Sequence, residues 1–575
     1  MDETALTFNN FTFTYKAQTT PSLYNINLTI RKGEKALILG HSGSGKSTLA
    51  YCINGLIPHA FDGVSSGSLS ILGEDAGKLN IFSLSKKVGT VLQDTDGQFV
   101  GLSAAEDIAF AAENDCLPVD EMHTLVFDTA KLVNMENHLK KSPQNLSGGQ
   151  KQRVSIAGVL IDQVEILLFD EPLANLDPAA GKQTIELIDE LHKRTNKTII
   201  IIEHRLEDAL HRSVDRIVAL EKGRVIADMK PETLLASTIL RDAGMREPLY
   251  ISALRYAGVA ITGTCKPANV NSIEFDPIAL QKWDHSLDEK PSTEKAPFLL
   301  EIKCLSFRYG APEGSPDHSG LALDDVSFSI EKGVIAALAG KNGAGKSTLA
   351  KLICGFDTPL SGSVFFDGAD FSSLSIKERS ECIGYVMQNP NQMISFPLIF
   401  DEVAFGLRNR GMPENEIKDR VEQTLDICGL YPFKAWPIRA LSFGQKKRLT
   451  IASILALGPS MLILDEPTAG QDFRSYSRIM EFVKKLNTEQ GVTLLMITHD
   501  MHLMLEYTSQ AIVIADGKLI ADDEPAVVLS DGAKTEEASL KRTSLYDLAV
   551  RAHIADAEGF VRKFIAYEQR HARLP

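Results

Sequence analysis

The chain has 575 residues, of which 44% are hydrophobic and 23% are charged, and its formal net charge is −15. This length corresponds to about three to four ordinary domains, with enough apolar material for more than one core. The acidic balance argues against a nucleic-acid partner, and the lack of an apolar run of about 18 residues argues against a membrane span or a signal peptide.

The second half of the chain repeats the first. The segment 40–48 recurs at 340–348, which is 300 positions later, whereas Gln93 recurs as Gln388, which is 295 positions later. The difference indicates five extra residues in the first half, which we place in the stretch 58–67. The sequence therefore predicts two copies of one unit.

A polar, proline-containing segment at 264–297 is typical of a linker between the two copies. The predicted domains are therefore 1–263 and 298–575, each with its own C-terminal helical tail. Within the linker, Trp283 indicates a stretch that docks on a domain. For the tails, we expect a structural cover rather than contact between the two copies.

Two kinds of strand are expected in each copy. Residues 25–30 and 325–330 alternate between polar and apolar, which is typical of half-buried antiparallel strands. Continuous apolar runs indicate parallel strands covered on both faces, and helical stretches between these runs predict an α/β fold built from βαβ units. The runs are 36–39, 166–169, 198–202, 334–338, 461–464 and 493–497.

A glycine-rich loop with the pattern GxxxxGK[ST] follows the first apolar run of each copy. The glycines let backbone N–H groups surround phosphate oxygens, the lysine adds positive charge, and the first serine after the lysine binds Mg²⁺. The next helix points its N-terminus at the anion. The pattern therefore predicts two sites for ATP and Mg²⁺. The loops contain Gly40, His41, Ser42, Gly43, Ser44, Gly45, Lys46, Ser47 and Thr48, and Gly340, Lys341, Asn342, Gly343, Ala344, Gly345, Lys346, Ser347 and Thr348.

Two adjacent carboxylates follow the second apolar run of each copy, as Asp170 and Glu171 and as Asp465 and Glu466. Ligands of α/β proteins bind at the carboxyl ends of strands. We expect the aspartates to position Mg²⁺ and the glutamates to orient and polarise the attacking water.

A serine- and glycine-containing motif opens an amphipathic stretch in each copy. Small residues at the start of a helix form an anion site. A simple helix N-cap is the alternative, which the pairing with a phosphate loop disfavours. The motifs contain Ser147, Gly148, Gly149 and Gln150, and Ser442, Phe443, Gly444 and Gln445.

Together, these motifs resemble those of the ATP-binding cassette (ABC) family, twice over nearly the whole chain. The resemblance implies two P-loop NTPase domains, each with a RecA-like parallel sheet core, an antiparallel β subdomain and a helical subdomain. It also implies roles for further residues. Gln93 and Gln388 match the Q-loop glutamines that sense Mg²⁺ and water, His204 and His499 match the switch histidines, Asp177 and Asp472 match the D-loops, and Tyr15 and Tyr309 match the aromatic residues that stack on adenine.

The ABC resemblance further implies a head-to-tail pair of cassettes within one chain. ATP on Lys46 would be covered by the motif around Ser442, and ATP on Lys346 by the motif around Ser147. Both composite sites keep every catalytic residue type, so we expect both to hydrolyse ATP. Phe443, in place of a glycine, adds bulk near one γ-phosphate and would make the two sites unequal.

The residues around the two Q-loop glutamines indicate a subgroup within the ABC family. Residues 93–98, 106–110, 388–392 and 401–406 are similar to stretches of energy-coupling factor (ECF) transporter ATPases. That similarity implies a peripheral ATPase on the cytoplasmic face of the cell membrane, an integral-membrane T component and a substrate-binding S component. The implied substrate is a vitamin, a vitamin precursor or a transition-metal ion.

Two alternatives remain at this level. Soluble tandem-cassette proteins that act on ribosomes resemble this chain in length, but they usually carry a long, charge-rich helical linker. Fused ATPases of sugar importers typically have one degenerate phosphate loop, whereas both loops here are intact.

Overall fold

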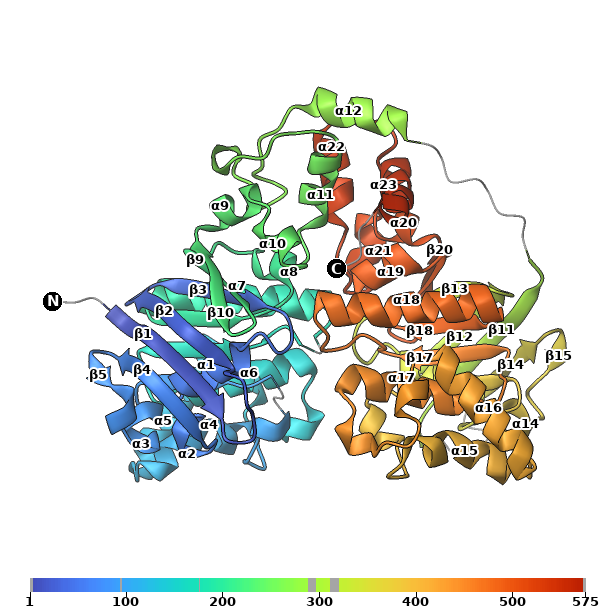
Figure 1. Cartoon of the computed structure of the whole chain (residues 1–575), viewed down its shortest axis with the longest axis horizontal. Coiled ribbons are helices and arrows are strands. Elements are labelled where there is room, and N and C mark those ends of the chain that lie inside the picture. The colour runs from blue at the N-terminus through green and yellow to red at the C-terminus, as the bar shows by residue number, and fades with distance from the viewer. Residues whose placement is uncertain (1–3, 94–95, 175, 288–295, 311–319, 572–575) are drawn as a thin grey trace.

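A computed structural model describes residues 4–93, 96–174, 176–287, 296–310 and 320–571. Residues 288–295 of the predicted linker lie outside this part of the chain. The two halves lie side by side, and their C-terminal tails meet above them in the view of Figure 1. Within the described residues, no helix is both long and apolar enough to cross a membrane.

An antiparallel sheet opens each half, with the strand orders β2-β1-β4-β5 and β12-β11-β14-β15. On β2, Ile26, Leu28 and Ile30 are buried while the residues between them are exposed. This alternation confirms the predicted antiparallel strands. The strands are β1 (Thr4–Tyr15), β2 (Leu23–Arg31), β4 (Gly63–Ile71), β5 (Glu74–Asp75), β11 (Phe298–Phe307), β12 (Leu323–Glu331), β14 (Ser361–Phe366) and β15 (Ala369–Asp370).

A six-stranded sheet forms the centre of each half, with the orders β10-β9-β3-β8-β7-β6 and β16-β17-β18-β13-β19-β20. Its core pairings are parallel, and β10 and β20 are added antiparallel at one edge. The strands of the first half are β3 (Lys35–Gly40), β6 (Val88–Val91), β7 (Ile166–Asp170), β8 (Thr198–Ile202), β9 (Arg216–Glu221) and β10 (Arg224–Met229). Those of the second are β13 (Ile335–Ala339), β16 (Ile383–Val386), β17 (Met461–Asp465), β18 (Thr493–Ile497), β19 (Gln510–Ala515) and β20 (Lys518–Asp523).

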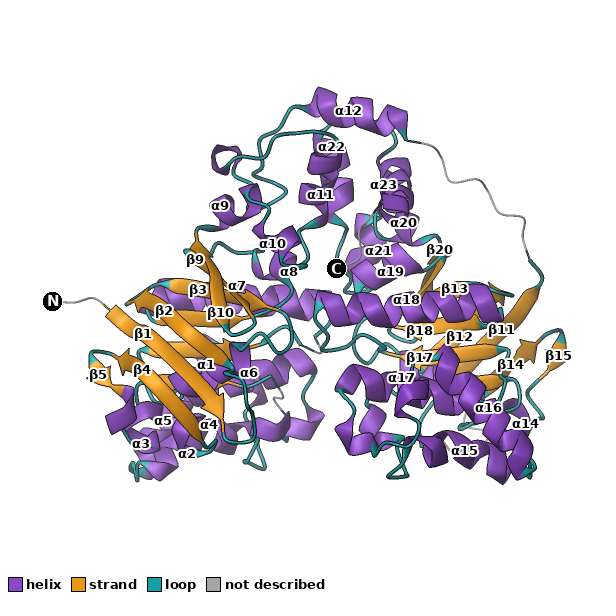
Figure 2. Cartoon of the chain, in the orientation of Figure 1, coloured by secondary structure: helices purple, strands orange, loops and turns teal. Residues whose placement is uncertain are grey.

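Helices cover these sheets and form a separate helical subdomain in each half (Figure 2). The α/β fold predicted from the apolar runs is therefore confirmed, because those runs need burial on both faces. The helices of the first half are α1 (Lys46–Ile53), α3 (Ile81–Ser85), α4 (Ala104–Asn114), α5 (Val119–Leu132), α6 (Gly148–Leu160) and α7 (Pro178–Thr195). Those of the second are α13 (Lys346–Cys354), α14 (Ile376–Arg379), α15 (Ile399–Asn409), α16 (Glu414–Ile427), α17 (Phe443–Leu455) and α18 (Phe473–Gln490).

The five extra residues of the first half form a short helix, α2 (Leu56–His59), and the turn after it. Gly67 and Gly362 mark the point where the register of 295 is restored. Both glycines have positive φ, and a Cβ on either would lie 2.4 Å from a backbone oxygen of the first strand of the half. The insertion therefore lies between α1 and Gly67, as the sequence predicted.

The two tails pack against each other rather than covering only their own halves, which differs from the sequence-based expectation. α11 contacts α22, and the two tails share one apolar cluster that includes Leu254, Phe560 and Phe564. The helices of the first tail are α9 (Pro231–Ala236), α10 (Ile239–Asp242) and α11 (Leu249–Tyr256), and those of the second are α20 (Pro525–Val528), α21 (Gly532–Glu537), α22 (Ser544–Arg551) and α23 (Ala557–His571). Outside the tails, α8 (Leu206–Ala209) and α19 (Met501–Tyr507) follow β8 and β18, and α12 (Pro277–Ser286) lies in the linker. A hydrophobic helix face must be buried somewhere, and here the matching tail buries it.

Part of the predicted linker is helical and docked. The Trp283 ring of α12 lies within about 6 Å of Tyr256 from the first tail and of Phe560 and Tyr567 from the second. Leu280 is completely buried, whereas Ile278 on the same helix is 56% exposed. α12 therefore adds a strap across both tails.

Alanine substitutions at Leu280 and Ile278 of α12 should differ in their effect on the free energy of unfolding. Leu280→Ala should lower the free energy of unfolding of the tails by about 2–5 kcal/mol because it leaves a cavity. Ile278→Ala should change it by less than about 0.5 kcal/mol. Urea unfolding followed by Trp283 fluorescence, in a Trp436→Phe background, measures both. Equal effects would show that α12 does not dock through Leu280.

Candidate functional site

The phosphate loops connect β3 to α1 and β13 to α13. Gly45 and Gly345 have φ of 104° and 107°, and a Cβ on either would lie 2.7 Å from a backbone oxygen, so both positions require glycine. The Lys46 ammonium donates hydrogen bonds to the carbonyls of Gly40 and His41 at 2.7 and 2.9 Å. Lys346 makes the equivalent contacts at 2.8 and 2.9 Å. Both lysines are thus held at the loop where phosphate would bind.

The predicted carboxylates lie at the carboxyl ends of β7 and β17. Glu171 and Glu466 have backbone φ angles of 48° and 44°, a left-handed conformation that residues other than glycine rarely adopt. Such local strain is concentrated at functional sites. The backbone therefore turns sharply to present these two side chains beside the lysines.

In the first half, two predicted residues converge on Glu171. Gln93 Nε2 donates a hydrogen bond of 2.8 Å to one carboxylate oxygen, and His204 Nδ1 lies 3.8 Å from the other. Burial raises the pKa of Glu171, but the interaction with His204 outweighs it and leaves this pKa below its usual value. Glu171 is therefore ionised at neutral pH and able to accept a proton.

In the second half, the geometry differs. His499 Nδ1 lies 2.7 Å from a carboxylate oxygen of Glu466, which is closer than His204 lies to Glu171. The Tyr385 hydroxyl donates a hydrogen bond of 2.7 Å to Asp465. At the equivalent position of the first half stands Thr90.

Two residues near the second site were missed by the sequence reasoning. Besides Tyr385, the buried Lys447 points its ammonium at the carbonyls of Met387 and Glu466, 3.4 Å away, and burial lowers its pKa to about 8. Its counterpart in the first half is Gln152. The signal that could have found both is the difference between repeats at positions that are otherwise in register.

Both aspartates are partly buried beside a glutamate, which disfavours their ionised form. Burial, and then the neighbouring Glu171, raise the pKa of Asp170 to about 6. Burial also raises the pKa of Asp465. A divalent cation would stabilise the ionised form of either carboxylate.

These residues fit Mg²⁺ as the sequence predicted it. Each site offers one carboxylate, from Asp170 or Asp465, and one exposed hydroxyl at a helix start, from Ser47 or Ser347. Mg²⁺ prefers oxygen ligands, and it is usually held by one or two carboxylates together with nucleotide phosphates. Among the described residues, no group of three or more His, Cys, Asp or Glu side chains could hold a metal by itself. The nucleotide would therefore complete the coordination.

The serine-glycine motifs open α6 and α17. Ser147 accepts a hydrogen bond from the Gln150 amide, and the Gln150 side chain accepts one from the Ser147 amide. Ser442 and Gln445 form the same capping box. The free amide groups of these helix starts remain available for an anion. Phe443, the first residue of α17, is 42% exposed.

The D-loop aspartates cross between the halves. Asp472 caps α18 with one carboxylate oxygen and accepts a hydrogen bond of 2.6 Å from the Ser42 amide with the other. Asp177 caps α7 and accepts a hydrogen bond of 3.3 Å from the Asn342 amide. Each phosphate loop therefore touches the D-loop of the opposite half.

The remaining predicted residues lie around the phosphate loops. The Tyr15 hydroxyl is 3.2 Å from the Thr48 hydroxyl, and the Tyr309 hydroxyl is 3.0 Å from that of Thr348. Ser44 and Ala344 are buried in the turns, and Ser44 Oγ is a buried group without a hydrogen-bond partner. Both tyrosines thus lie beside a phosphate loop.

Comparison with known proteins gives two family matches. The profile described as "ABC transporter" matches residues 23–174 and 323–469. A second, described as "ATP-binding cassette cobalt transporter", matches residues 237–307, which span the first tail and the linker.

Relatives align over nearly the whole chain. An ABC transporter ATP-binding protein of Vibrio parahaemolyticus is 54% identical over 566 residues, covering 98% of this chain and 96% of that one. One of Clostridium perfringens is 54% identical over 564 residues, covering 98% of each. Among solved structures, cbiO1 from Clostridium perfringens, described as part of the ABC transporter complex cbiONQ, is 31% identical. It covers 46% of this chain and 100% of its own, with a TM-score of 0.39.

The contact between His41 and Asp472 should respond to pH. Hydrogen bonding to Asp472 raises the pKa of His41 above its ordinary 6.5, although burial opposes the shift. A raised pKa means that the stabilisation is complete below pH 6.5 and is lost as the pH rises through the raised value. Asp472→Asn should therefore lower the pKa of His41, as measured by NMR. Asp177→Asn is the matched control and should leave it unchanged. An unaltered His41 pKa in Asp472→Asn would remove Asp472 as its partner.

Proposed function

The chain belongs to the ABC transporter family, and we propose that it is the ATPase subunit of an ECF-type importer that takes up a micronutrient. As a member of that family it is an ATP-binding subunit and an ATPase with two cassettes. We propose that residues 1–263 and 298–575 each form one cassette with its tail, and that both ATP sites are active.

The observation that carries two composite sites is the reciprocal contact of the D-loops. Asp472 reaches the loop of Lys46, and Asp177 reaches the loop of Lys346. A nucleotide on either lysine would then lie between the two halves, facing the opposite serine-glycine motif. Contacts that exist only in the closed state let ATP binding shift the population toward closure.

The proposed chemistry assigns one role to each predicted group. Lys46 and Lys346 bind the β- and γ-phosphates. Glu171 and Glu466 accept a proton from the attacking water, and the switch histidines hold these glutamates and contact the γ-phosphate. Mg²⁺, held by Ser47, Asp170 and Gln93 or by Ser347, Asp465 and Gln388, would neutralise the phosphate charge. Tyr15 and Tyr309 would stack on adenine.

Apolar side chains beside the Q-loops support docking of a membrane T component. Leu92 and Met387 each precede a Q-loop glutamine, and Phe110 and Phe405 lie at equivalent positions on α4 and α15. All four are between 37% and 45% exposed. A single exposed apolar side chain is ordinary, but the same exposure at matched positions of both repeats is what docking of a partner on each half would require. We propose that Leu92 and Phe110 bind one helix of the T component on the cytoplasmic face of the membrane, and that Met387 and Phe405 bind another.

The second family match supports one class of substrate. That profile is named for cobalt transport and covers residues 237–307, which include most of the first tail. Of the micronutrients implied by the ECF resemblance, it favours a transition-metal ion. A separate S component would bind this substrate.

Removing both catalytic carboxylates should separate binding from turnover. Glu171→Gln with Glu466→Gln should keep ATP affinity but lower steady-state turnover by about 10²–10⁴-fold, because the general base is lost. Glu186→Gln, on α7 and paired with His211, is the control and should retain full activity. Near-normal turnover in the double variant would exclude these glutamates as bases.

A negative charge at Phe110 and at Phe405, one in each half, should prevent binding of the membrane partner. Phe110→Glu with Phe405→Glu should abolish co-purification of small membrane proteins in mild detergent while ATP hydrolysis by the isolated chain stays within about twofold. Val550→Glu, a change at an exposed residue of the second tail, is the control. Co-purification of ribosomes with the wild-type chain, in place of membrane proteins, would overturn the importer proposal.

A further inference from the structure

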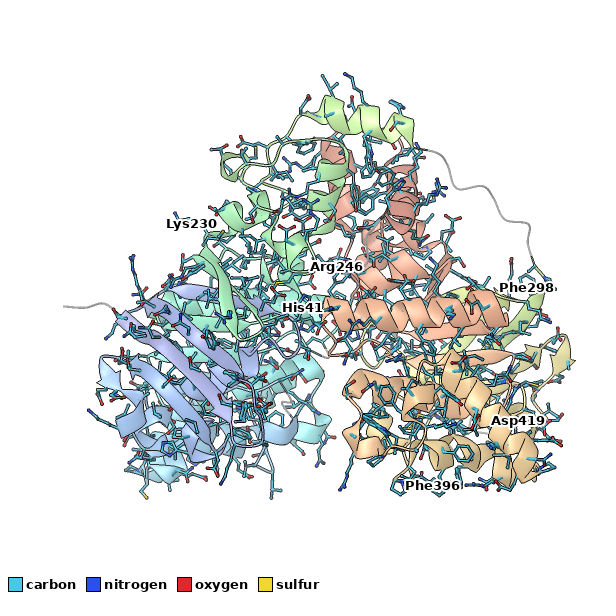
Figure 3. The ribbon with its side chains drawn as sticks, viewed as in Figure 1. His41, Lys230, Arg246, Phe298, Phe396 and Asp419 are labelled. Atoms are coloured by element: carbon cyan, nitrogen blue, oxygen red, sulfur yellow. The ribbon has the colours of Figure 1, made fainter. Side chains whose placement is uncertain are left out.

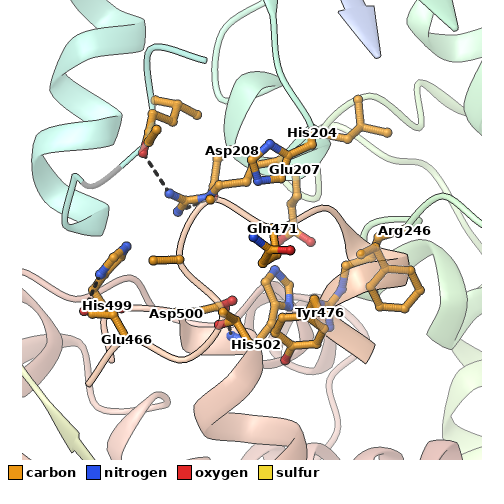
Figure 4. A pocket seen from close by; sticks show the side chains of 18 of the residues that line it. His204, Glu207, Asp208, Arg246, Glu466, Gln471, Tyr476, His499, Asp500 and His502 are labelled. Atoms are coloured by element: carbon orange, nitrogen blue, oxygen red, sulfur yellow. Dashed lines mark hydrogen bonds and ion pairs between the residues drawn. The ribbon is translucent and has the colours of Figure 1, made fainter. Parts of the chain in front are cut away.

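Each tail reaches across to the helix that follows the switch histidine of the opposite half. Lys541, between α21 and α22, contacts Asp208 on α8 of the first half, and Arg246, between α10 and α11, forms an ion pair with Glu506 on α19 of the second. A cavity of about 100 Å³ lies between the two contacts and is lined by both switch histidines (Figure 4). Figure 3 labels Arg246 and His41, which lie where the two halves of the chain meet.

The first bridge runs from the second tail to the loop after Glu171. The Lys541 ammonium donates to Asp208 at 2.7 Å, and the other Asp208 oxygen accepts a hydrogen bond of 2.8 Å from Arg205. Arg205 directly follows His204, and it also donates to the carbonyl of Leu173 at 3.2 Å. Lys541 is therefore two contacts away from the segments that carry His204 and Glu171.

The second bridge runs from the first tail to the segments that carry His499 and Asp472. Besides pairing with Glu506, the Arg246 guanidinium lies over the ring of Phe473, 5.0 Å from its centroid. Phe473 is the residue after the D-loop aspartate and begins α18. α19 starts two residues after His499 and is capped by Asp500. Arg246 therefore contacts α19, which follows His499 of the Lys346 site, and the start of α18, whose capping Asp472 holds the phosphate loop of the Lys46 site.

The ion pairs between the tails and the opposite halves are partly shielded from solvent, so removing one partner should have a measurable effect. The side chains of Arg246 and Glu506 are 19% and 14% exposed, and that of Asp208 is 20% exposed, whereas its partner Lys541 is 42% exposed. Burial raises the pKa of Asp208, but Arg205 and Lys541 outweigh it and hold this pKa well below its usual value. Removing one partner from a shielded pair leaves an uncompensated charge, which is more costly than losing a surface pair.

We propose that Lys541 and Arg246 are positioning residues that connect each tail to the switch histidine of the opposite cassette. Lys541 sets His204 and hence hydrolysis at the Lys46 site, whereas Arg246 sets His499 and hence hydrolysis at the Lys346 site. This inference rests on the proposed roles of the two histidines and the two glutamates.

The repeat supplies a matched control. Arg542 stands 296 positions after Arg246, at the same place in the second tail. Its guanidinium pairs with Asp547 at 2.6 Å, within its own tail. Arg542→Met therefore removes the same kind of side chain and an ion pair, but its partners Asp547 and Tyr546 both lie in its own tail.

The test isolates one ATP site at a time in the purified full chain. Glu466→Gln leaves only the Lys46 site able to hydrolyse, and Glu171→Gln leaves only the Lys346 site. Single-turnover hydrolysis of bound ATP should then give one ADP per chain in either background. Two ADP per chain would overturn the proposed role of the glutamates, whatever the tails do.

The tail variants are then added to each background. Lys541→Met should slow hydrolysis about 3- to 30-fold at the Lys46 site, because the segment that carries His204 loses the contact that positions it, and should leave the Lys346 site unchanged. A tenfold change in rate corresponds to about 1.4 kcal/mol in the barrier. Arg246→Met should slow the Lys346 site by about 3- to 30-fold and slow the Lys46 site less, because it reaches that site only through Phe473 beside Asp472. Arg542→Met should slow neither site. Lys541→Arg should restore the rate, since it keeps the charge.

A merely structural role would give a different pattern. If Lys541→Met or Arg246→Met slowed both sites equally, or slowed neither, or if Arg542→Met matched them, the proposal would be overturned. Lys541→Gln gives a second, milder variant, and Lys541 is 42% exposed, so the fold tolerates it. Thermal unfolding of each variant separates loss of rate from loss of folded protein.

Discussion

The carboxylate of Asp472 ties the two cassettes together at the point where ATP would bind. One oxygen caps α18, the other accepts from the Ser42 amide of the opposite phosphate loop, and His41 lies 3.6 Å away. A capping carboxylate is fixed by the helix it starts, so the loop that it holds is fixed as well. The composite sites, the position of the lysines and the contact of the tails with the switch segments all depend on this register between the halves.

The two sites share a sequence pattern but differ in their physical surroundings. Asp177 reaches Asn342 at 3.3 Å, a longer contact than that of Asp472, and the loop residue Lys341 pairs with Asp516 of its own half instead of crossing. The second site also has Tyr385 on Asp465 and the buried Lys447, where the first has Thr90 and Gln152. A hydroxyl donor and a buried cation both stabilise the ionised carboxylates. The two sites therefore differ in their surroundings at positions besides Phe443.

The sequence predicted whatever depends on local pattern. Alternation in 25–30 and the continuous run at 198–202 correctly gave antiparallel and parallel strands, because the faces a strand must bury are set by its neighbours in sequence. The phosphate loops were found because only glycine fits positions such as Gly45. The family resemblance implied a head-to-tail pair of cassettes and marked Asp177 and Asp472 as D-loop residues, but their contacts with the opposite phosphate loops were not predicted.

The tails escaped prediction because repeats that match in sequence do not have matching neighbours. Arg246 and Arg542 occupy the same place in the repeat, yet one crosses to Glu506 and the other stays with Asp547. Docking of the stretch around Trp283 was expected, but its partners, which are rings from both tails, were not, because they are distant in sequence. Long-range packing of this kind is decided by which surfaces are left over after each half has folded.

A shared tail core changes what ATP must do. Leu254, Phe560 and Phe564 are completely buried in the cluster that both tails build, so separating the cassettes fully would expose a large apolar area. The covalent link adds a high effective concentration of one cassette around the other. A separation of the cassettes that leaves this tail core packed would expose less apolar area than complete dissociation. Under the proposed function, ATP binding would therefore need only to close the two cassettes on each other beneath their joined tails.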